Sequence, residues 1–187
     1  MYFAQAGAAN TERCLQAAQE RAAELGIEHI VVATTSGQTG ARAAEVFRGR
    51  QVVVVTHSAG FKGPNIQELQ AEHRRTIEEA GAKVLTCQHA FGGVGRAIRR
   101  KLGTYQVDEV MAFVLRTFCD GVKVACEITL MATDAGLIPA GREVIAIGGT
   151  GQGADSALVL RSANSQDCLD LRVLEVICKP RCGGRPA

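Results

Sequence analysis

The chain has 187 residues, of which 47% are hydrophobic and 21% charged, and its formal net charge is +2. These values are typical of a soluble globular protein with one domain over residues 1–187, and they give no electrostatic case for nucleic-acid binding. The sequence has no recognisable signal peptide and no apolar run near the ~18 residues of a membrane span. We therefore expect a cytoplasmic protein that does not associate with membranes.

The N-terminal half predicts strands that alternate with helices. A helix is expected to begin at Asn10-Thr11-Glu12 and to end at Gly26, because its apolar residues repeat at helical spacing. The next expected elements are strand 28–33, helix 40–48, strand 51–56, helix 65–80 directly after Pro64, and strand 83–87. Continuous apolar strands with short connections indicate a parallel sheet that helices cover on both faces.

The C-terminal half predicts three helices followed by three strands. The helices are expected over 94–102, 106–118 and 121–134, and the strands over 143–148, 156–161 and 171–178. The connections between these last strands are too short for helical crossovers, so the strands should pair antiparallel. The expected fold class is α/β, a three-layer open sheet that is mostly parallel with antiparallel C-terminal strands.

The seven cysteines are odd in number and scattered, mostly within apolar runs. We interpret them as reduced thiols, most of them small core residues. Cys178 and Cys182 lie near the end of the chain without a histidine or a second cysteine pair nearby, which makes a zinc site weak. No metal site is predicted.

The loop after the first apolar strand is the strongest candidate for a binding site. Thr34, Thr35, Ser36, Gly37, Gln38 and Thr39 lie between an apolar strand and a helix. The first N–H groups of a helix are unpaired and suit a phosphate, which the hydroxyl groups would also bind. Gly37 should be needed because a side chain there would block the anion or resist the turn, while the fold would survive its replacement. The alternative is a capped strand-to-helix turn without a ligand.

Three other loops at strand ends are also rich in glycine, hydroxyl residues or histidine. Ligands of open parallel sheets bind at the carboxyl ends of the strands, where these loops should meet. Histidines and phenylalanines in two of the loops suggest a pocket with aromatic and hydrogen-bonding walls; a solvated or structural histidine is the alternative. The residues concerned are His57, Gly60, Phe61, His89, Phe91 and Gly92, with Gly149, Thr150 and Gly151 in the third loop.

The segment Gly149-x-Gly151-x-x-Ala154 superficially fits the dinucleotide-binding fingerprint. That fingerprint requires a helix next, whereas the residues that follow predict a strand. We therefore reject a Rossmann cofactor site. A glycine loop that lets the backbone approach a ligand remains possible.

The helix over 121–134 is apolar apart from one stripe of charges. Asp120, Lys123, Glu127 and Asp134 share one face, which is either solvated or turned towards the site or a subunit interface. The basic run 96–101 is interpreted as a solvated helical face. Apolar positions between 106 and 134 exceed what one small sheet can cover, so we expect a homo-oligomer. No serine, cysteine or carboxylate arrangement predicts catalytic residues.

With these residues in view, the chain resembles the stand-alone pyruvate kinase C-terminal-domain-like family. The resemblance rests on Val31–Gly37, Val55–Phe61, Gly121–Ala125, Met131–Ile138 and Ile145–Gly151. It implies the fold of that α/β domain and a phosphate on Thr34-Thr35-Ser36-Gly37, which looks like the Thr-x-Ser-Gly loop that grips the effector's phosphate in pyruvate kinase. Some family members hold flavin mononucleotide (FMN). Because the catalytic barrel is absent, phosphoryl transfer is not implied.

We therefore expect FMN or a similar phosphorylated ligand at the strand carboxyl ends, with its phosphate on the 34–39 loop and its ring among the histidines and phenylalanines. The alternative is a regulatory module that senses a sugar phosphate without catalysis. A pure assembly module would not need the four polar glycine loops. Whether the protein is an enzyme stays open.

Overall fold

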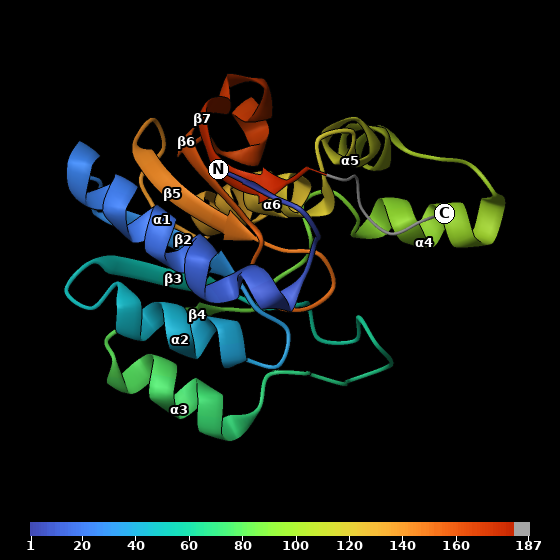
Figure 1. Cartoon of the computed structure of the whole chain (residues 1–187). Coiled ribbons are helices and arrows are strands. Elements are labelled where there is room, and N and C mark those ends of the chain that lie inside the picture. Colours follow the sequence, from blue (N-terminus) through green and yellow to red (C-terminus); the bar gives the residue numbers. More distant parts are fainter. Residues whose placement is uncertain (182–187) are drawn as a thin grey trace.

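In the computed structural model, which describes residues 1–181, the strands form one mixed sheet between two layers of helices (Figure 1). The strand order is β1-β7-β6-β5-β2-β3-β4. The sheet contains β1 (Tyr2–Phe3), β2 (His29–Ala33), β3 (Gln51–Val55), β4 (Lys83–Leu85), β5 (Glu143–Gly148), β6 (Ser156–Arg161) and β7 (Arg172–Pro180). Strands β2, β3, β4 and β5 run parallel, whereas β6 pairs antiparallel with both β5 and β7. The predicted fold class is confirmed.

The sheet is buried on both faces because its strands alternate their side chains between two apolar clusters. In β2, Ile30 and Val32 lie in one cluster, and Val31 lies in the other. Successive side chains of a strand point to opposite faces, so a run of apolar residues supplies both. This packing explains why β2, β3 and β5 are apolar after their first residues, which are His29, Gln51 and Glu143.

Helices from different parts of the chain cover the two faces. One layer holds α1 (Thr11–Leu25), α2 (Gln38–Val46) and α3 (Ala71–Glu79). The other is centred on α6 (Asp120–Asp134), against which α5 (Val107–Arg116) packs. Helix α4 (Val94–Leu102) contacts α5, and the two project away from the sheet in Figure 1. Short 3-10 helices occupy Ala8–Asn10 and Ser165–Asp170.

The sequence-based boundaries hold to within a few residues, with one clear exception. The helix expected over 65–80 begins only at Ala71, and the segment before it is irregular. The backbone of this segment is not helical: Gln70 N–H donates to Ser36 O at 3.0 Å, and Asn65 has a left-handed φ of 62°. These constraints are incompatible with a helix from residue 65, and they hold the segment against the strand ends. Strand β1 and the 3-10 helices were not among the predicted elements.

The cysteines of the described part of the chain are free thiols, as expected. Cys14, Cys119, Cys126 and Cys178 are buried, and Cys87 and Cys168 are partly buried. Cys182 lies outside the described residues. Over residues 1–181, no helix is long and apolar enough to cross a membrane.

Candidate functional site

A cleft of about 1370 Å³ lies at the carboxyl ends of the parallel strands. Its walls come from the ends of β2 and β3, the glycine loop after β5, the first turn of α2 and one face of α6. Polar loops that are far apart in sequence thus meet at one edge of the sheet, as the parallel pairing requires. Of the predicted site residues, those that line the cleft are Thr34, Thr35, Ser36, Gln38, Thr39, His57, Phe61, His89, Lys123, Glu127, Gly149 and Gly151.

The loop before α2 combines a helix cap with unused hydrogen-bond donors. The Thr34 hydroxyl accepts the N–H groups of Gly37 at 3.1 Å and Gly40 at 3.3 Å, while Thr34 N–H donates to Val55 O at 2.9 Å. Thr34 therefore has the capping role that the alternative interpretation expected of this loop, and whether the loop also binds a ligand stays a separate question. The N–H groups of Thr35, Ser36, Gln38 and Thr39 have no protein acceptor within residues 1–181. These donors, rather than Thr34, are available to an anion.

Gly37 serves the turn and does not line the cleft. Its φ of 103° lies in the left-handed region, and a Cβ there would come within 2.5 Å of His73 Cβ and 2.6 Å of Leu69 Cδ1. Replacing Gly37 would therefore disturb the packing of α3 as well as the turn. A side chain here would point into the protein, so His73 and Leu69 would have to shift, and we expect its replacement to lower stability as well as to affect the loop.

His57, Phe61 and His89 form a ring cluster on the cleft wall. The ring centroids of Phe61 lie 4.2 Å from His57 and 5.0 Å from His89. His57 Nδ1 lies 2.8 Å from a carboxylate oxygen of Glu68, which can only accept, so this nitrogen carries the proton. Phe61 is 38% exposed, so part of its ring is accessible from the cleft.

The His89 ring is buried and neutral. Its relative exposure is 9%, and burial lowers its pKa from 6.5 to about 4. Ser58 N–H donates to His89 Nε2 at 3.2 Å, which leaves the single ring proton on Nδ1. His89 thus offers an N–H donor at neutral pH.

A buried ion pair on α6 forms part of the cleft wall. Lys123 and Glu127 are each 4% exposed, and the ammonium donates to the carboxylate. Burial lowers the pKa of Lys123, and the neighbouring carboxylate opposes that shift. The other Glu127 oxygen accepts Phe91 N–H at 2.8 Å. Asp120, which pairs with Arg116, also lines the cleft, whereas Asp134 accepts hydrogen bonds from 164 and 165 and does not line it.

Several predicted residues lie outside the cleft. Phe91 is a core residue that does not reach a pocket wall, and Lys123 Nζ lies 6.0 Å from its ring centroid. Thr150 donates its N–H to Asp155, and its hydroxyl is buried. Gly60 and Gly92 instead line a neighbouring pocket of about 600 Å³, which contacts the same ring cluster.

Three arginines line the cleft that were not predicted from the sequence as site residues. Arg96 lines both pockets, and its guanidinium lies 4.9 Å from the Phe61 ring centroid. Burial lowers its pKa, so the solvated-face interpretation of the run 96–101 is wrong for this residue. A signal was present in the sequence: Arg96 follows the glycines that end a strand-end loop. Arg42 and Arg116 also line the cleft, each paired with a carboxylate.

The cleft thus combines hydrogen-bond donors with a cluster of rings. Donors and cations outnumber unpaired carboxylates, and the ring cluster supplies a stacking surface. Across the part of the chain that the structure describes, no group of three or more His, Cys, Asp or Glu side chains could hold a metal ion.

Comparison with known proteins adds a family match. The family model for "Pyruvate kinase, alpha/beta domain" matches residues 12–160. A crystal structure of pyruvate kinase from Cryptosporidium parvum is 17% identical, with a TM-score of 0.43, and the match covers 82% of this chain and 23% of that one. For the same enzyme in complex with ADP the values are 17%, 0.43, 82% and 24%. An NH3-dependent NAD synthetase from Campylobacter jejuni is 13% identical, with a TM-score of 0.36 and coverage of 72% and 53%. The chain spans about a quarter of the length of these pyruvate kinases.

Proposed function

The chain belongs to the pyruvate kinase alpha/beta domain family, and from this premise and the contents of the cleft we propose that it binds a phosphorylated ligand with a planar aromatic ring. FMN is the ligand we favour. The observation that carries the proposal is the presence, in one cleft, of unpaired helix N–H groups and an accessible ring cluster.

The phosphate would lie at the first turn of α2. Gln38 and Thr39 N–H groups point from the helix end, and the hydroxyls of Thr35, Ser36 and Thr39 make no hydrogen bond within residues 1–181. A dianion here would gain charge-assisted hydrogen bonds and the favourable end of the helix dipole. Thr34 would keep the helix in place without contributing a donor from its backbone.

The ring would lie against Phe61 and His57. Phe61 is more exposed than a core phenylalanine, which is costly unless a ligand covers it. The buried Lys123 and Glu127 would line the remaining wall with balanced charge. A bound flavin supplies electron or hydride transfer; we propose no catalytic role for this chain's residues.

The test compares FMN with riboflavin, which lacks the phosphate, in titrations followed by flavin fluorescence. FMN should bind the wild type far more tightly. The Ser36→Ala variant should bind FMN roughly tenfold or more weakly, because one charged hydrogen bond contributes about 1.5–3 kcal/mol. Thr34→Ala is the matched control, because it also removes a hydroxyl from this loop. It should lower the free energy of unfolding by about 1 kcal/mol, but it should weaken FMN binding less than Ser36→Ala does.

Equal affinity for riboflavin and FMN would refute the phosphate site. The loop would act only as a helix cap if Ser36→Ala bound FMN with unchanged affinity while Thr34→Ala lost stability. If FMN fails to bind while a sugar phosphate raises the melting temperature, the site belongs to a sugar-phosphate-sensing module instead. That module would use the first turn of α2 in the same way but would leave the ring cluster unused.

A further inference from the structure

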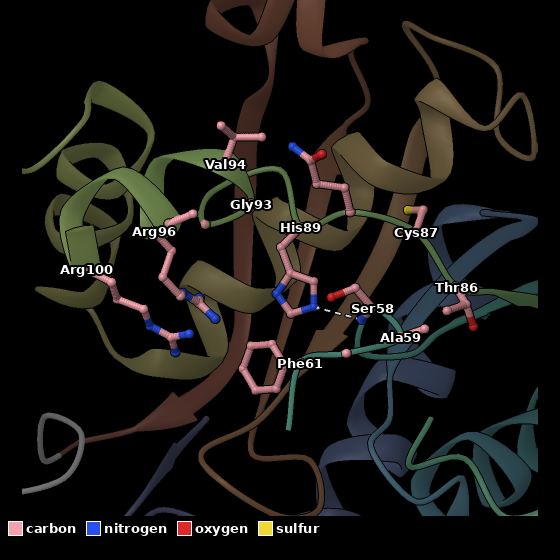
Figure 2. Close-up of a pocket in the computed structure, with 14 residues that line it drawn as sticks. Ser58, Ala59, Phe61, Thr86, Cys87, His89, Gly93, Val94, Arg96 and Arg100 are labelled. Carbon is pink, nitrogen blue, oxygen red and sulfur yellow. Dashed lines mark hydrogen bonds between the residues drawn. The ribbon is translucent and has the colours of Figure 1, made fainter. Parts of the chain in front are cut away.

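A second pocket, of about 600 Å³, lies beside the cleft and shares part of its wall (Figure 2). Phe61, His89 and Arg96 line both spaces, so one group of side chains separates two possible ligands. The proposed phosphorylated ligand uses the α2 side of this wall. The other side, towards α4, has no role in that proposal.

The His89 ring presents a donor for which the chain provides no acceptor. Its Nε2 accepts Ser58 N–H, so its proton lies on Nδ1. In Figure 2 this second nitrogen faces away from Ser58, on the side where Arg96 lies. Within residues 1–181 no hydrogen bond reaches His89 Nδ1, although the side chain is more than nine-tenths buried. Nδ1 is not one of the fully buried polar atoms that lack a partner in the described residues, so this N–H keeps accessible surface and can donate to a molecule in the pocket that His89 lines.

Arg96 adds an unpaired cation to the same place. Its guanidinium stacks on Phe61 and forms no ion pair with any carboxylate in the described part of the chain. Among the carboxylates, Glu127 has the largest electrostatic effect on the pKa of Arg96. Its two oxygens already accept hydrogen bonds from Lys123 and from Phe91 N–H. The neighbouring Arg99 differs, because Glu109 pairs with it at 2.8 Å.

The rest of the pocket suits an organic molecule rather than a bare ion. Arg100 contributes a second guanidinium without an ion pair in the described residues, and Val94 and Ala97 contribute apolar surface. A planar guanidinium and an adjacent N–H match the two oxygens of a carboxylate. We propose that this pocket binds a small organic acid, whose carboxylate is held by His89 Nδ1–H and the Arg96 guanidinium, with Arg100 at its mouth.

The experiment measures malonate binding by titration calorimetry, with the uncharged malonamide as the matched ligand. Malonate should bind and malonamide should not. Arg96→Ala should weaken malonate binding by about tenfold or more, since it removes a charge-assisted hydrogen bond. Lys101→Ala is the control variant, because it removes a cation from α4 at a residue that lines neither pocket; its affinity should match the wild type.

A pair of substitutions at position 89 tests the donor itself. Asn places an amide N–H near the position of Nδ1, whereas Gln places its amide near Nε2, so His89→Asn should retain malonate binding that His89→Gln loses. Urea denaturation checks that each variant folds, and Arg96→Ala keeps the proposal testable if neither does. Equal binding of malonate and malonamide, an unchanged affinity in Arg96→Ala, or binding of inorganic phosphate but not malonate would each overturn the proposal.

The pocket does not depend on the phosphate loop. Ser36→Ala should therefore bind malonate as the wild type does, even where it loses FMN. If FMN fails to bind the wild type and malonate still binds with the expected dependence on Arg96, only the proposed function falls. If FMN binds and malonate does not, only the organic-acid site falls.

Discussion

Replacing Lys123 by methionine should lower the free energy of unfolding by about 3–5 kcal/mol, because it strands the Glu127 carboxylate without its counter-charge in a buried site. Both side chains lie on α6, one turn apart, and are 4–5% exposed. Methionine keeps the length of the lysine stem, so the change removes charge with little loss of volume. The carboxylate would keep a single donor, Phe91 N–H.

The double variant Lys123→Met, Glu127→Gln provides the comparison. Glutamine retains an oxygen for Phe91 N–H, and no buried charge remains, so the double variant should recover most of the loss. The two substitutions should therefore be strongly non-additive, with a coupling of about 0.5–3 kcal/mol or more. Additive losses would show that the two side chains do not interact.

Urea denaturation at neutral pH measures the effect through the transition midpoint and the slope m. Equal slopes in all variants would allow the free energies to be compared directly. A loss below about 1 kcal/mol in Lys123→Met would refute the reasoning, because it would place the pair in the range of solvated surface ion pairs. The α6 charges would then form a solvated face after all.

Other predictions follow from single contacts. Burial lowers the pKa of His89 from 6.5 to about 4, so the unfolded chain takes up the proton before the folded protein does as pH falls. Between pH 6.5 and 4, urea denaturation should therefore show the wild type losing about 3 kcal/mol more stability than His89→Gln. Gly37→Ala should destabilise the fold by more than about 1 kcal/mol because of its left-handed φ of 103° and the close α3 packing; an unchanged transition midpoint would contradict this. Ile128→Ala should lower the free energy of unfolding by ~2–5 kcal/mol because it leaves a cavity, whereas a loss below ~0.5 kcal/mol would place the residue outside the core. The outer face of α5 exposes Val110 and its apolar neighbours, so light scattering should find a homo-oligomer that Val110→Glu dissociates, whereas a strict monomer would remove the idea.

Some residues of the candidate site can be predicted from the local sequence, and others cannot. The 34–39 loop can be predicted as a candidate site, because apolar strand residues are followed by hydroxyl residues and glycine directly before a helix. The same pattern could not assign roles within the loop. Thr34 became the cap because its side chain reaches two N–H groups, and Gly37 became a packing residue because α3 lies against it.

Arg96 shows the opposite case. On α4 its charge looks like part of a solvated basic face, and only the position of α4 beside the Phe61 loop turns it into a pocket residue. Phe91 was misplaced for a related reason: it lies in a strand-end loop, yet the loop folds inward over α6 and buries the ring.

The sequence by itself determined the layers and the edge at which function should lie. Apolar runs of strand length, short connections and helical periodicity are local properties, and parallel pairing brings strand carboxyl ends together without further information. Tertiary structure alone decided the start of α3, the burial of Lys123 and Glu127, and the partners of His89 and Arg96. Several of those outcomes depend on contacts between segments 30 or more residues apart. The type of a residue does not say which distant group will bury it or form a hydrogen bond with it.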